Sequence, residues 1–319
     1  MQAYNILKNI TKVLFPRNKV FLNQIGRAFY YKRRFLQVKS RVLKQPLSHE
    51  IPLAGGEKIY YKIPAWDPSA NEVFLTKGLS DWGLERLFKI LTQSGGLFID
   101  VGAHTGYFAH LFYDKCEDFI LIETSKRCVS ESLNPLLEEW TSKTIKIVNA
   151  PAFDVSGVEL EIAESADGWG MSDSINSAFH QNAINREVMT TVTIDGEYLS
   201  MKSNLPVTAI KIDVDGPDIE VLEGAKDVIA KYRPIIFIEN SEQRLLKVCK
   251  KIGYECFTFN SSRENPSLMY FTKLTDKTNF DELWAIMCLL VPTESSVLLN
   301  SLVGFRRNNH DKIHLFEEF

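Results

Sequence analysis

The segment Leu97–Phe108, with the sequence LFIDVGAHTGYF, constrains the fold of this chain more than any other. An apolar run ends in Asp100, a turn with Gly102 and Gly106 follows, and a second apolar run then begins. This order predicts a buried strand, a tight loop and a helix N-terminus. Because glycine adopts positive φ and lets a ligand approach the backbone, we predict a ligand-binding loop. An ordinary strand–turn–helix without a ligand is the alternative.

The spacing of the glycines indicates the kind of ligand. A dinucleotide fingerprint, G-x-G-x-x-G, that starts at Gly102 needs glycines where this chain has His104 and Tyr107. The chain instead has D-x-G-x-x-x-G, with Asp100 at the end of the strand. A carboxylate repels a pyrophosphate and suits a cationic or hydroxyl-rich ligand. S-adenosylmethionine, which has an ammonium group, a sulfonium and no phosphate, fits this better than a nicotinamide cofactor.

Apolar runs and helical patterns alternate from Leu97 to Ile252. This alternation predicts an α/β fold with a doubly wound, mostly parallel sheet. We expect seven strands, of which Tyr254–Phe259 and Leu268–Phe271 are the last two. The domain that contains them is predicted to span residues 49–273.

Two extensions flank this domain. Residues 1–48 have many Lys and Arg residues and no Asp or Glu, and their apolar residues recur at helical spacing, which predicts basic amphipathic helices. Such helices either attach residues 1–45 to an anionic membrane surface or pack on the domain as an arm. Residues 274–319 are predicted to be a helical extension, in which Leu283–Val303 covers the domain or forms a homodimer contact.

The remaining composition bears on the partners and the compartment. Of the anionic partners that a basic segment can bind, we expect a membrane surface rather than nucleic acid. The five cysteines include no C-x-x-C pattern, which fits a reducing compartment. No secretory signal pattern is visible, and the longest apolar run, Leu283–Pro292, is too short to span a bilayer. We therefore expect a cytoplasmic protein, peripheral at the membrane if residues 1–45 bind lipid.

Polar side chains stand where the predicted strands end. They are Asp100, Glu123, Asn149, Asp213 and Glu239. Ligands of doubly wound sheets bind outside the carboxyl ends of the strands. Because adjacent carboxylates repel one another, their convergence on one edge is hard to explain by stability. We predict a binding site there, with Glu123 placed to accept hydrogen bonds from ribose hydroxyls.

Two motifs resemble the FkbM family of S-adenosylmethionine-dependent methyltransferases. The first is Phe98–Phe108, and the second and more specific is Ile210–Ala225, IKIDVDGPDIEVLEGA. Supporting matches are the aromatic-x-x-Glu from Trp82 to Glu85, Val192–Asp195 and Arg233–Pro234. The likeness covers roughly residues 71–273.

The chain departs from the family pattern at three places. The family usually has Asn where this chain has His104, and Glu where it has Asp215. It often has Glu-Pro where this chain has Glu123 and Thr124. The shorter side chain of Asp215 puts in doubt any contact that needs a glutamate.

The resemblance implies a Rossmann-like class I methyltransferase fold and S-adenosylmethionine as the cofactor. It implies that the loop after the first strand lies against the methionine part of the cofactor and that Asp100 holds its amino group. Glu123 would bind the ribose, and Asn149 and Ala150 would border the adenine. The other cofactor-binding residues that it implies are Glu85, Gly102, Ala103, His104, Thr105, Gly106 and Tyr107.

The function expected from these residues is O-methylation of a sugar, a glycan or a secondary metabolite. Positioning contributes most to methyl transfer from a sulfonium, and the acceptor hydroxyl must also lose its proton. Asp213 is the first candidate base and Asp215 the second. The polar segment Glu164–Arg186 is either a lid over the acceptor or a surface insertion. The alternative function is a catalytically inactive binding or scaffold protein on the same fold, tethered through its basic N-terminus.

A metal-dependent variant of this mechanism is also open. Asp213, Glu239 and Asn240 supply oxygen ligands of the kind that Mg²⁺ and Ca²⁺ prefer. The other interpretation is that these side chains bind the acceptor or cap loops.

Overall fold

The computed structural model describes residues 47–64, 67, 73, 81, 83–165, 173–174, 183–214, 216–240, 242–262, 268–285 and 287–308. Its centre is a ten-stranded sheet. The strands are β3 (Leu97–Val101), β4 (Asp118–Ile122), β5 (Thr144–Val148), β9 (Val207–Ile212), β10 (Ile235–Ile238), β11 (Tyr254–Ser262), β12 (Leu268–Leu274), β13 (Leu283–Trp284), β14 (Cys288–Pro292) and β15 (Arg306–Asn308). The predicted basic helices of residues 1–48, and with them the membrane contact of residues 1–45, fall almost entirely outside the described residues and stay predictions.

The strand order is β5–β4–β3–β9–β10–β14–β11–β12–β15, and β13 pairs with β11. Neighbouring strands from β5 to β10 are parallel. β14 is antiparallel to both β10 and β11, so β11 runs in the same direction as β10. The predicted fold class, an α/β protein with a doubly wound and mostly parallel sheet, is therefore confirmed. β12, β13 and β15 enlarge the sheet beyond the seven strands expected.

One strand replaces an expected helix. We expected pieces of helix in Leu283–Val303, but β14 lies in the middle of the sheet and all of its residues are buried. A short continuous apolar run suits a buried strand as well as a buried helix, and here pairing with β10 and β11 decides. Helix appears only afterwards, in α14 (Val297–Leu302). Part of the predicted C-terminal extension thus belongs to the sheet, while the homodimer contact stays a prediction.

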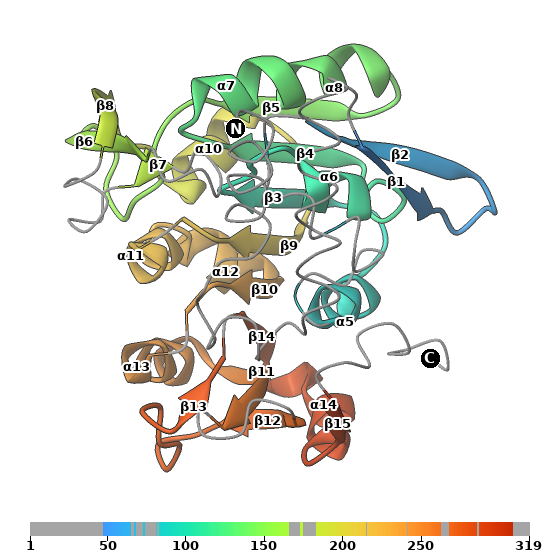
Figure 1. Ribbon diagram of the computed structural model, residues 1–319, viewed down its shortest axis with the longest axis vertical. Coiled ribbons are helices and arrows are strands. Elements are labelled where there is room, and N and C mark those ends of the chain that lie inside the picture. Colours follow the sequence, from blue (N-terminus) through green and yellow to red (C-terminus); the bar gives the residue numbers. More distant parts are fainter. Residues whose placement is uncertain are drawn as a thin grey trace, which may run out of the picture.

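Helices cover both faces of the sheet. They are α5 (Leu84–Leu91), α6 (Tyr107–Leu111), α7 (Lys126–Cys128), α8 (Asn134–Glu139), α10 (Ile194–Met201), α11 (Asp218–Glu223), α12 (Lys226–Tyr232), α13 (Gln243–Ile252) and α14, with a π turn, Val129–Leu133, between α7 and α8 and a 3-10 turn, Thr293–Ser295, before α14. Figure 1 shows α11 and α13 on one side of the sheet, and α5 and α14 on the other. The hairpin of β1 (Leu47–Pro52) and β2 (Lys58–Ile63) lies beside α6. Among the described residues, no helix combines the length and the hydrophobicity needed to cross a membrane.

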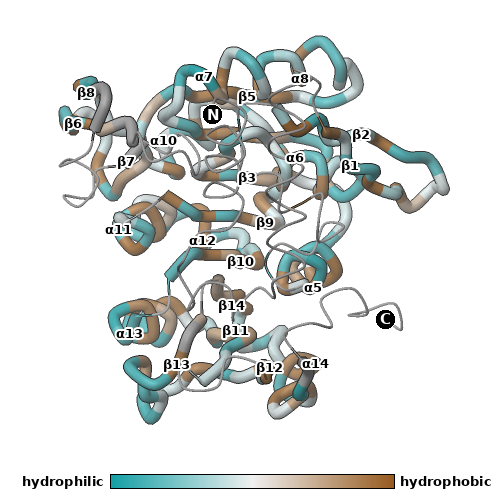
Figure 2. The backbone as a smooth tube through the Cα atoms, in the orientation of Figure 1, coloured by the Kyte–Doolittle hydropathy of each residue, from teal (hydrophilic) through white to brown (hydrophobic). Residues whose placement is uncertain are grey.

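The buried side chains form one cluster on each face of the sheet. Phe98 of β3 belongs to the cluster under α5 and α6, whereas its neighbours Leu97 and Ile99 belong to the cluster under α10 to α13. This alternation is what a strand covered on both faces requires. In Figure 2 the hydrophobic stretches of the chain follow these central strands.

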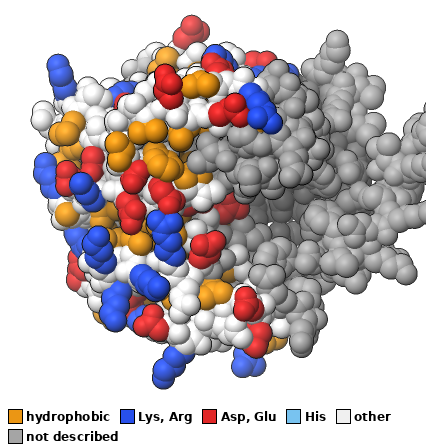
Figure 3. Space-filling model, turned by 90° about the vertical axis from the view of Figure 1, so that its left-hand side faces the viewer, with side chains coloured by type: hydrophobic (Ala, Val, Ile, Leu, Met, Phe, Trp, Pro, Cys, Tyr) orange, Lys and Arg blue, Asp and Glu red, His pale blue; other side chains and the backbone are white. Residues whose placement is uncertain are grey.

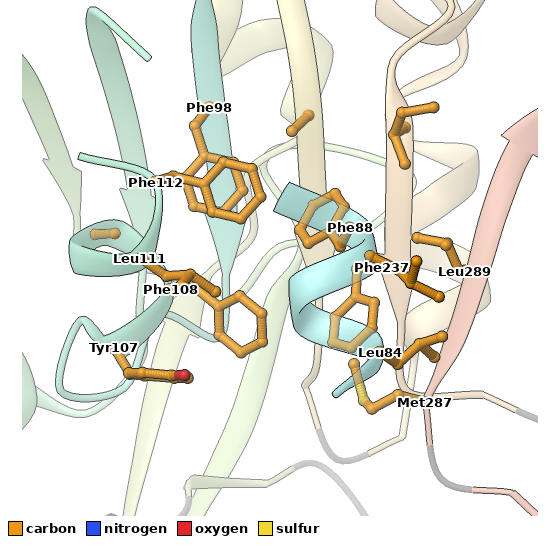
Figure 4. Close-up of a cluster of buried hydrophobic side chains, with 14 of the residues drawn as sticks. Leu84, Phe88, Phe98, Tyr107, Phe108, Leu111, Phe112, Phe237, Met287 and Leu289 are labelled. Atoms are coloured by element: carbon orange, nitrogen blue, oxygen red, sulfur yellow. The ribbon is translucent and has the colours of Figure 1, made fainter. Parts of the chain in front are cut away.

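Aromatic rings anchor α5 to the sheet next to the loop after β3. Phe88 of α5 is fully buried and stacks on Phe237 of β10, with ring centroids 5.2 Å apart. Phe98 stacks on Phe112 at 4.4 Å, and Phe112 in turn lies 4.7 Å from Phe88 (Figure 4). This packing holds α5 and the end of α6 against the sheet.

Phe88→Leu should lower the free energy of unfolding by about 1–2 kcal/mol, because it removes ring contacts while it keeps the site apolar. Guanidinium-induced unfolding measures the change. The matched control is Ile90→Leu on the same helix, which is 47% exposed and should change stability by less than about 0.5 kcal/mol. Equal effects of the two substitutions would contradict the packing described here.

A small antiparallel sheet stands apart from the central one. It consists of β6 (Glu159–Ser165), β7 (Asp173–Ser174) and β8 (Ala183–Thr190), in the order β7–β6–β8 (Figure 1). Parts of the segment expected to be a loop, Glu164–Arg186, are therefore strands. Residues 166–172 and 175–182 lie outside the described residues, so the lid over the acceptor stays a prediction.

The surface on the α11 and α13 side carries both signs of charge. Figure 3 shows Lys and Arg side chains interspersed with Asp and Glu on this side, around a group of apolar side chains. Arg244 of α13 pairs with Glu220 of α11, with 2.6 Å between guanidinium Nη1 and carboxylate Oε1. Such exposed pairs contribute little to stability, so this face is ordinary solvated surface around the two helices.

Candidate active site

The loop between β3 and α6 has an unusual backbone. Gly102, His104 and Gly106 have φ values of 73°, 50° and 82°. The backbone N–H groups of Gly102 and Ala103 both donate to the carbonyl of Ile122, at 2.9 and 3.1 Å. The loop is therefore held by the end of β4. Its positive φ values at positions 102 and 106 favour glycine, because L side chains rarely adopt them, and His104 is the exception in this loop.

Asp100 is the buried carboxylate at the start of this loop. It is completely inaccessible to solvent, and neither carboxylate oxygen has a hydrogen-bond partner among the described residues. Burial raises the pKa of Asp100 to about 6, although Lys211 opposes the shift. A carboxyl group whose pKa is raised by folding lowers the stability of the protein as pH rises from about 4 to about 6. Above that range the loss stays constant. A buried acid that destabilises the fold at neutral pH and lacks hydrogen bonds indicates a ligand that donates to it.

Lys211 of β9 is the partner that the sequence analysis missed. It lies opposite Asp100 in the register of β3 and β9 and is 3% exposed. Its Nζ donates to the Gly102 carbonyl at 2.6 Å and lies 3.2 Å from Asp213 Oδ2 and 3.5 Å from Asp100 Oδ1. The sequence did indicate such a residue, because Lys211 stands between Ile210 and Ile212 inside a strand otherwise buried on both faces. A buried cation needs a charged or hydrogen-bonding partner.

Asp213 stands at the carboxyl end of β9, with 39% of its side chain exposed. Burial alone would raise the pKa of Asp213, but Lys211, a hydrogen bond with Glu239 and the nearby His104 together hold it below its ordinary value. The backbone N–H of Glu239 donates to the carbonyl of Ile212, which places its carboxyl group beside Asp213. The structure thus brings these two predicted acids together, and keeps Asp213 ionised.

Glu123 at the end of β4 ties the loop to the next strand. Its Oε2 accepts the backbone N–H of His104 at 2.7 Å and its Oε1 accepts that of Ser125 at 2.8 Å. The amide of Asn149 donates to the backbone carbonyls of Glu123 and Thr124, at 2.8 Å each. Oε1 of Glu123 also accepts from the hydroxyl of Thr124 at 3.5 Å, whereas Oε2 can still accept a second hydrogen bond, so the predicted binding of a ribose hydroxyl fits this geometry.

This geometry coincides with a sequence family. The family profile described as "Methyltransferase FkbM domain" matches residues 100–289, from Asp100 to the middle of β14. The chain belongs to the FkbM methyltransferase family. The resemblance predicted from the two motifs is confirmed.

Several solved methyltransferases are similar in fold to this FkbM-family chain. The FkbM methyltransferase of Methylobacillus flagellatus KT is 14% identical, with a TM-score of 0.38; the match covers 84% of this chain and 60% of that one. The precorrin-6y C5,15-methyltransferase of Geobacter metallireducens GS-15 is 12% identical, over 66% and 85% of the two chains, with a TM-score of 0.34. TrmK of M. capricolum, in complex with S-adenosylhomocysteine, is 10% identical, over 66% and 67%, with a TM-score of 0.34. No curated protein matches the chain.

The remaining predicted cofactor residues of this FkbM-family chain surround the loop. Ala150, after β5, is buried, and Tyr107 begins α6 and is buried as well. Glu85 is buried at the start of α5, where its carboxylate accepts the backbone N–H groups of Gly83 at 3.0 Å and Asp81 at 3.3 Å. The contacts that the structure shows for Glu85 thus support the helix start, and its contact with a cofactor stays a prediction. The second candidate base, Asp215, lies outside the described residues.

The β1–β2 hairpin supports the FkbM loop from outside. The hydroxyl groups of Tyr61 in β2 and Thr105 are hydrogen-bonded at 2.5 Å, and both residues are buried. The imidazole Nε2 of His104 lies 3.4 Å from Oδ2 of Asp67, which is also buried. Neither contact was apparent from the sequence, because Tyr61 of the hairpin and Asp67, which follows it, both precede the loop and lie outside the two motifs.

Tyr61→Phe should lower the free energy of unfolding by about 1–2 kcal/mol, because it leaves the buried hydroxyl of Thr105 without its partner. Chemical denaturation checks this. Tyr60→Phe, at a neighbouring position that is 55% exposed, is the control and should be neutral within about 0.5 kcal/mol. If both variants are as stable as the unaltered protein, the Tyr61–Thr105 bond does not support the loop.

The structure brings two of the three expected metal ligands together. Asp213 and Glu239 lie together, but Oδ1 of Asn240 accepts the backbone N–H of Glu242 at 3.0 Å, just before α13. Throughout the described ranges, no group of three His, Cys, Asp or Glu side chains is arranged to hold a metal ion. The amide oxygen of Asn240 thus supports the turn before α13, and the site made by Asp213, Glu239 and Asn240 stays a prediction.

Proposed function

We propose that this chain is an S-adenosylmethionine-dependent O-methyltransferase whose acceptor is a hydroxyl of a sugar, a glycan or a secondary metabolite. The observation that carries the proposal is Asp100, a buried carboxylate with no hydrogen-bond partner among the described residues, at the start of the glycine loop. The ammonium group of Lys211 lies 3.5 Å from its Oδ1 without a hydrogen bond, so an ammonium group of a ligand would suit this carboxylate as a hydrogen-bond donor. The family of the chain supports methyl transfer as the reaction.

The charges around the loop suit a cationic cofactor. Asp100, Asp213 and Glu123 face one cation, Lys211, and Glu239 lies beside Asp213. The amino group of the cofactor would bind Asp100, its methionine part would lie along the loop from Gly102 to Gly106, and its ribose hydroxyls would bind Glu123. Asn149 and Ala150 would border the adenine. S-adenosylmethionine supplies a methyl group on a cationic sulfonium, which a site with an excess of carboxylates attracts.

The acceptor is expected to bind beside Asp213. As the new carbon–oxygen bond forms, the hydroxyl proton must leave. The Asp213 carboxylate has 39% of its side chain exposed and can therefore contact an acceptor that binds beside it. Its lowered pKa keeps it charged and able to accept a hydrogen bond, although it makes Asp213 a weak base. We therefore assign Asp213 mainly to orienting the hydroxyl, consistent with a reaction that depends on positioning.

Two measurements test the proposal. Calorimetry with S-adenosylhomocysteine, which keeps the amino group and the nucleoside, should give micromolar binding. A methyl-donor assay with a panel of sugars, glycans and hydroxylated metabolites, read by mass spectrometry, should then show one class of acceptor gaining a methyl group. Absence of binding in folded protein would refute the cofactor site, whereas binding with methylation at nitrogen or carbon would refute O-methylation alone.

A further inference from the structure

Lys211 is buried in the middle of the parallel sheet. Its strand, β9, has β3 on one side and β10 on the other, and only 3% of the residue is exposed. Nζ lies 5.5 Å from the centre of the Phe108 ring, on the face of the sheet that α6 covers. Burying an ammonium group costs several kcal/mol unless partners compensate for its lost hydration. A cation kept at this position therefore has a task that an apolar residue could not perform.

The partners of Lys211 come from the cofactor loop and from its own strand. Nζ donates to the Gly102 carbonyl at 2.6 Å and lies 3.4 Å from the carbonyl of Val101. It lies between two carboxylates, 3.2 Å from Asp213 Oδ2 and 3.5 Å from Asp100 Oδ1. One ammonium group thus contacts the loop backbone and both acids at the start of the cofactor site.

We propose that Lys211 is a positioning residue of the cofactor site, which keeps the Asp100 carboxylate charged and holds the loop carbonyl of Gly102 in place. The role rests on the proposed function, because it assigns the charged Asp100 to the amino group of the cofactor. Lys211 itself is turned towards protein groups and is not assigned a contact with either substrate.

The charged groups that face Asp100 explain the need for Lys211. Lys211 and Asp213 belong to β9 and its end, and Glu123 follows β4. Burial is the largest cause that raises the pKa of Asp100, and Asp213 and Glu123 raise it as well, whereas Lys211 lowers it; the net result is a pKa of about 6. Without this cation, Asp100 would be largely protonated at neutral pH and would lose its attraction for an ammonium group.

Lys211→Met tests the role directly. In the unaltered protein, the affinity for S-adenosylhomocysteine should rise with pH and level off above about 6, as Asp100 becomes charged. In Lys211→Met the rise should move to higher pH by at least one unit, because an opposite charge at this distance lowers a carboxyl pKa by about 1–3 units. At pH 7 the affinity should fall about twofold if the midpoint moves by one unit and on the order of a hundredfold if it moves by three units. Lys211→Arg should restore most of it.

A second variant gives the opposite shift. Asp213→Asn removes a negative charge that raises the pKa of Asp100, so the midpoint should move to lower pH. Asp213 stands at the exposed end of β9, where an asparagine is tolerated, so this arm remains if Lys211→Met fails to fold. The control is Lys273→Met, which breaks an ion pair with Glu255 on the β12–β11 side of the sheet and should leave the midpoint unchanged.

The carbon-13 resonance of the Asp100 carboxyl group gives the same midpoint without any ligand. Its assignment comes from its loss in Asp100→Asn. Unchanged midpoints in Asp213→Asn and in the folded Lys211 variants would overturn the role of Lys211. If S-adenosylhomocysteine does not bind but the carboxyl midpoints shift as stated, the proposed function fails while the control of Asp100 by Lys211 stands.

Discussion

Gly102→Ala is expected to eliminate binding of S-adenosylhomocysteine and to lower the free energy of unfolding by about 3–5 kcal/mol. The φ of Gly102 is 73°, and a Cβ atom on it would lie 1.8 Å from the carbonyl oxygen of Asp213. The carbonyl oxygen belongs to the backbone and the position of a Cβ is fixed by the backbone, so no side-chain rotation can relieve the overlap. The loop would have to move away from the end of β9, and the contact of Lys211 with the Gly102 carbonyl would be lost with it.

The matched control for this prediction is Gly157→Ala. Gly157 has a φ of 87°, but a Cβ on it would meet nothing within 4 Å. Only the conformational cost of a left-handed alanine remains, about 1–2 kcal/mol, and S-adenosylhomocysteine should bind unchanged. Chemical denaturation and calorimetry on both variants separate the backbone conformation from the overlap. Equal losses of stability would show that the loop does not pack against Asp213 as described.

Asp100→Asn is expected to weaken the binding of S-adenosylhomocysteine about 100-fold, which corresponds to about 3 kcal/mol, while the protein stays folded. Asparagine has nearly the shape of aspartate, so the packing around the site is kept. What disappears is the buried negative charge that would pair with the amino group of the ligand. Because this loss is one of charge, it should be largest at pH 7–8 and shrink towards pH 5, where Asp100 is already protonated.

Asp118→Asn controls for the removal of a carboxylate from the same sheet. Asp118 begins β4 at the opposite edge of the sheet and accepts a hydrogen bond from the hydroxyl of Ser203 at 2.7 Å. Its replacement should leave the affinity for S-adenosylhomocysteine within about twofold, since it lies far from the strand ends that form the site. Calorimetry at pH 5, 6, 7 and 8 measures both variants. A pH-independent loss in Asp100→Asn would argue against an ammonium–carboxylate contact.

Most of the site was predictable because it follows from local sequence. Asp100 and Gly102 identify a strand end and a tight turn within a few residues, and parallel strands place all such ends on one edge. The convergence of Asp213 and Glu239 follows from the same rule. The rule does not say which hydrogen bonds the side chains at these strand ends form. The amide of Asn149, expected to border the adenine, is engaged with the carbonyls of Glu123 and Thr124 and thus shapes the strand ends.

The residues that sequence reasoning missed depend on partners far along the chain. Tyr61 precedes the loop motif by more than a strand and a helix, yet its hydroxyl supports Thr105. A lysine inside a buried strand indicates that Lys211 needs a partner, but only the register of β9 and β3 shows that the partner is Asp100. No local pattern records such pairings.

The sequence alone determined the fold class, the loop after β3 and the acidic edge of the sheet, because strand ends, glycine turns and helical spacing are properties of short segments. Only the tertiary structure decided that Cys288–Pro292 is a strand, since an apolar run of that length becomes helix or strand according to its neighbours, here β10 and β11. It also decided which acids lie against Lys211. Charge interactions depend on distance in space, and that distance exists only after the sheet has formed.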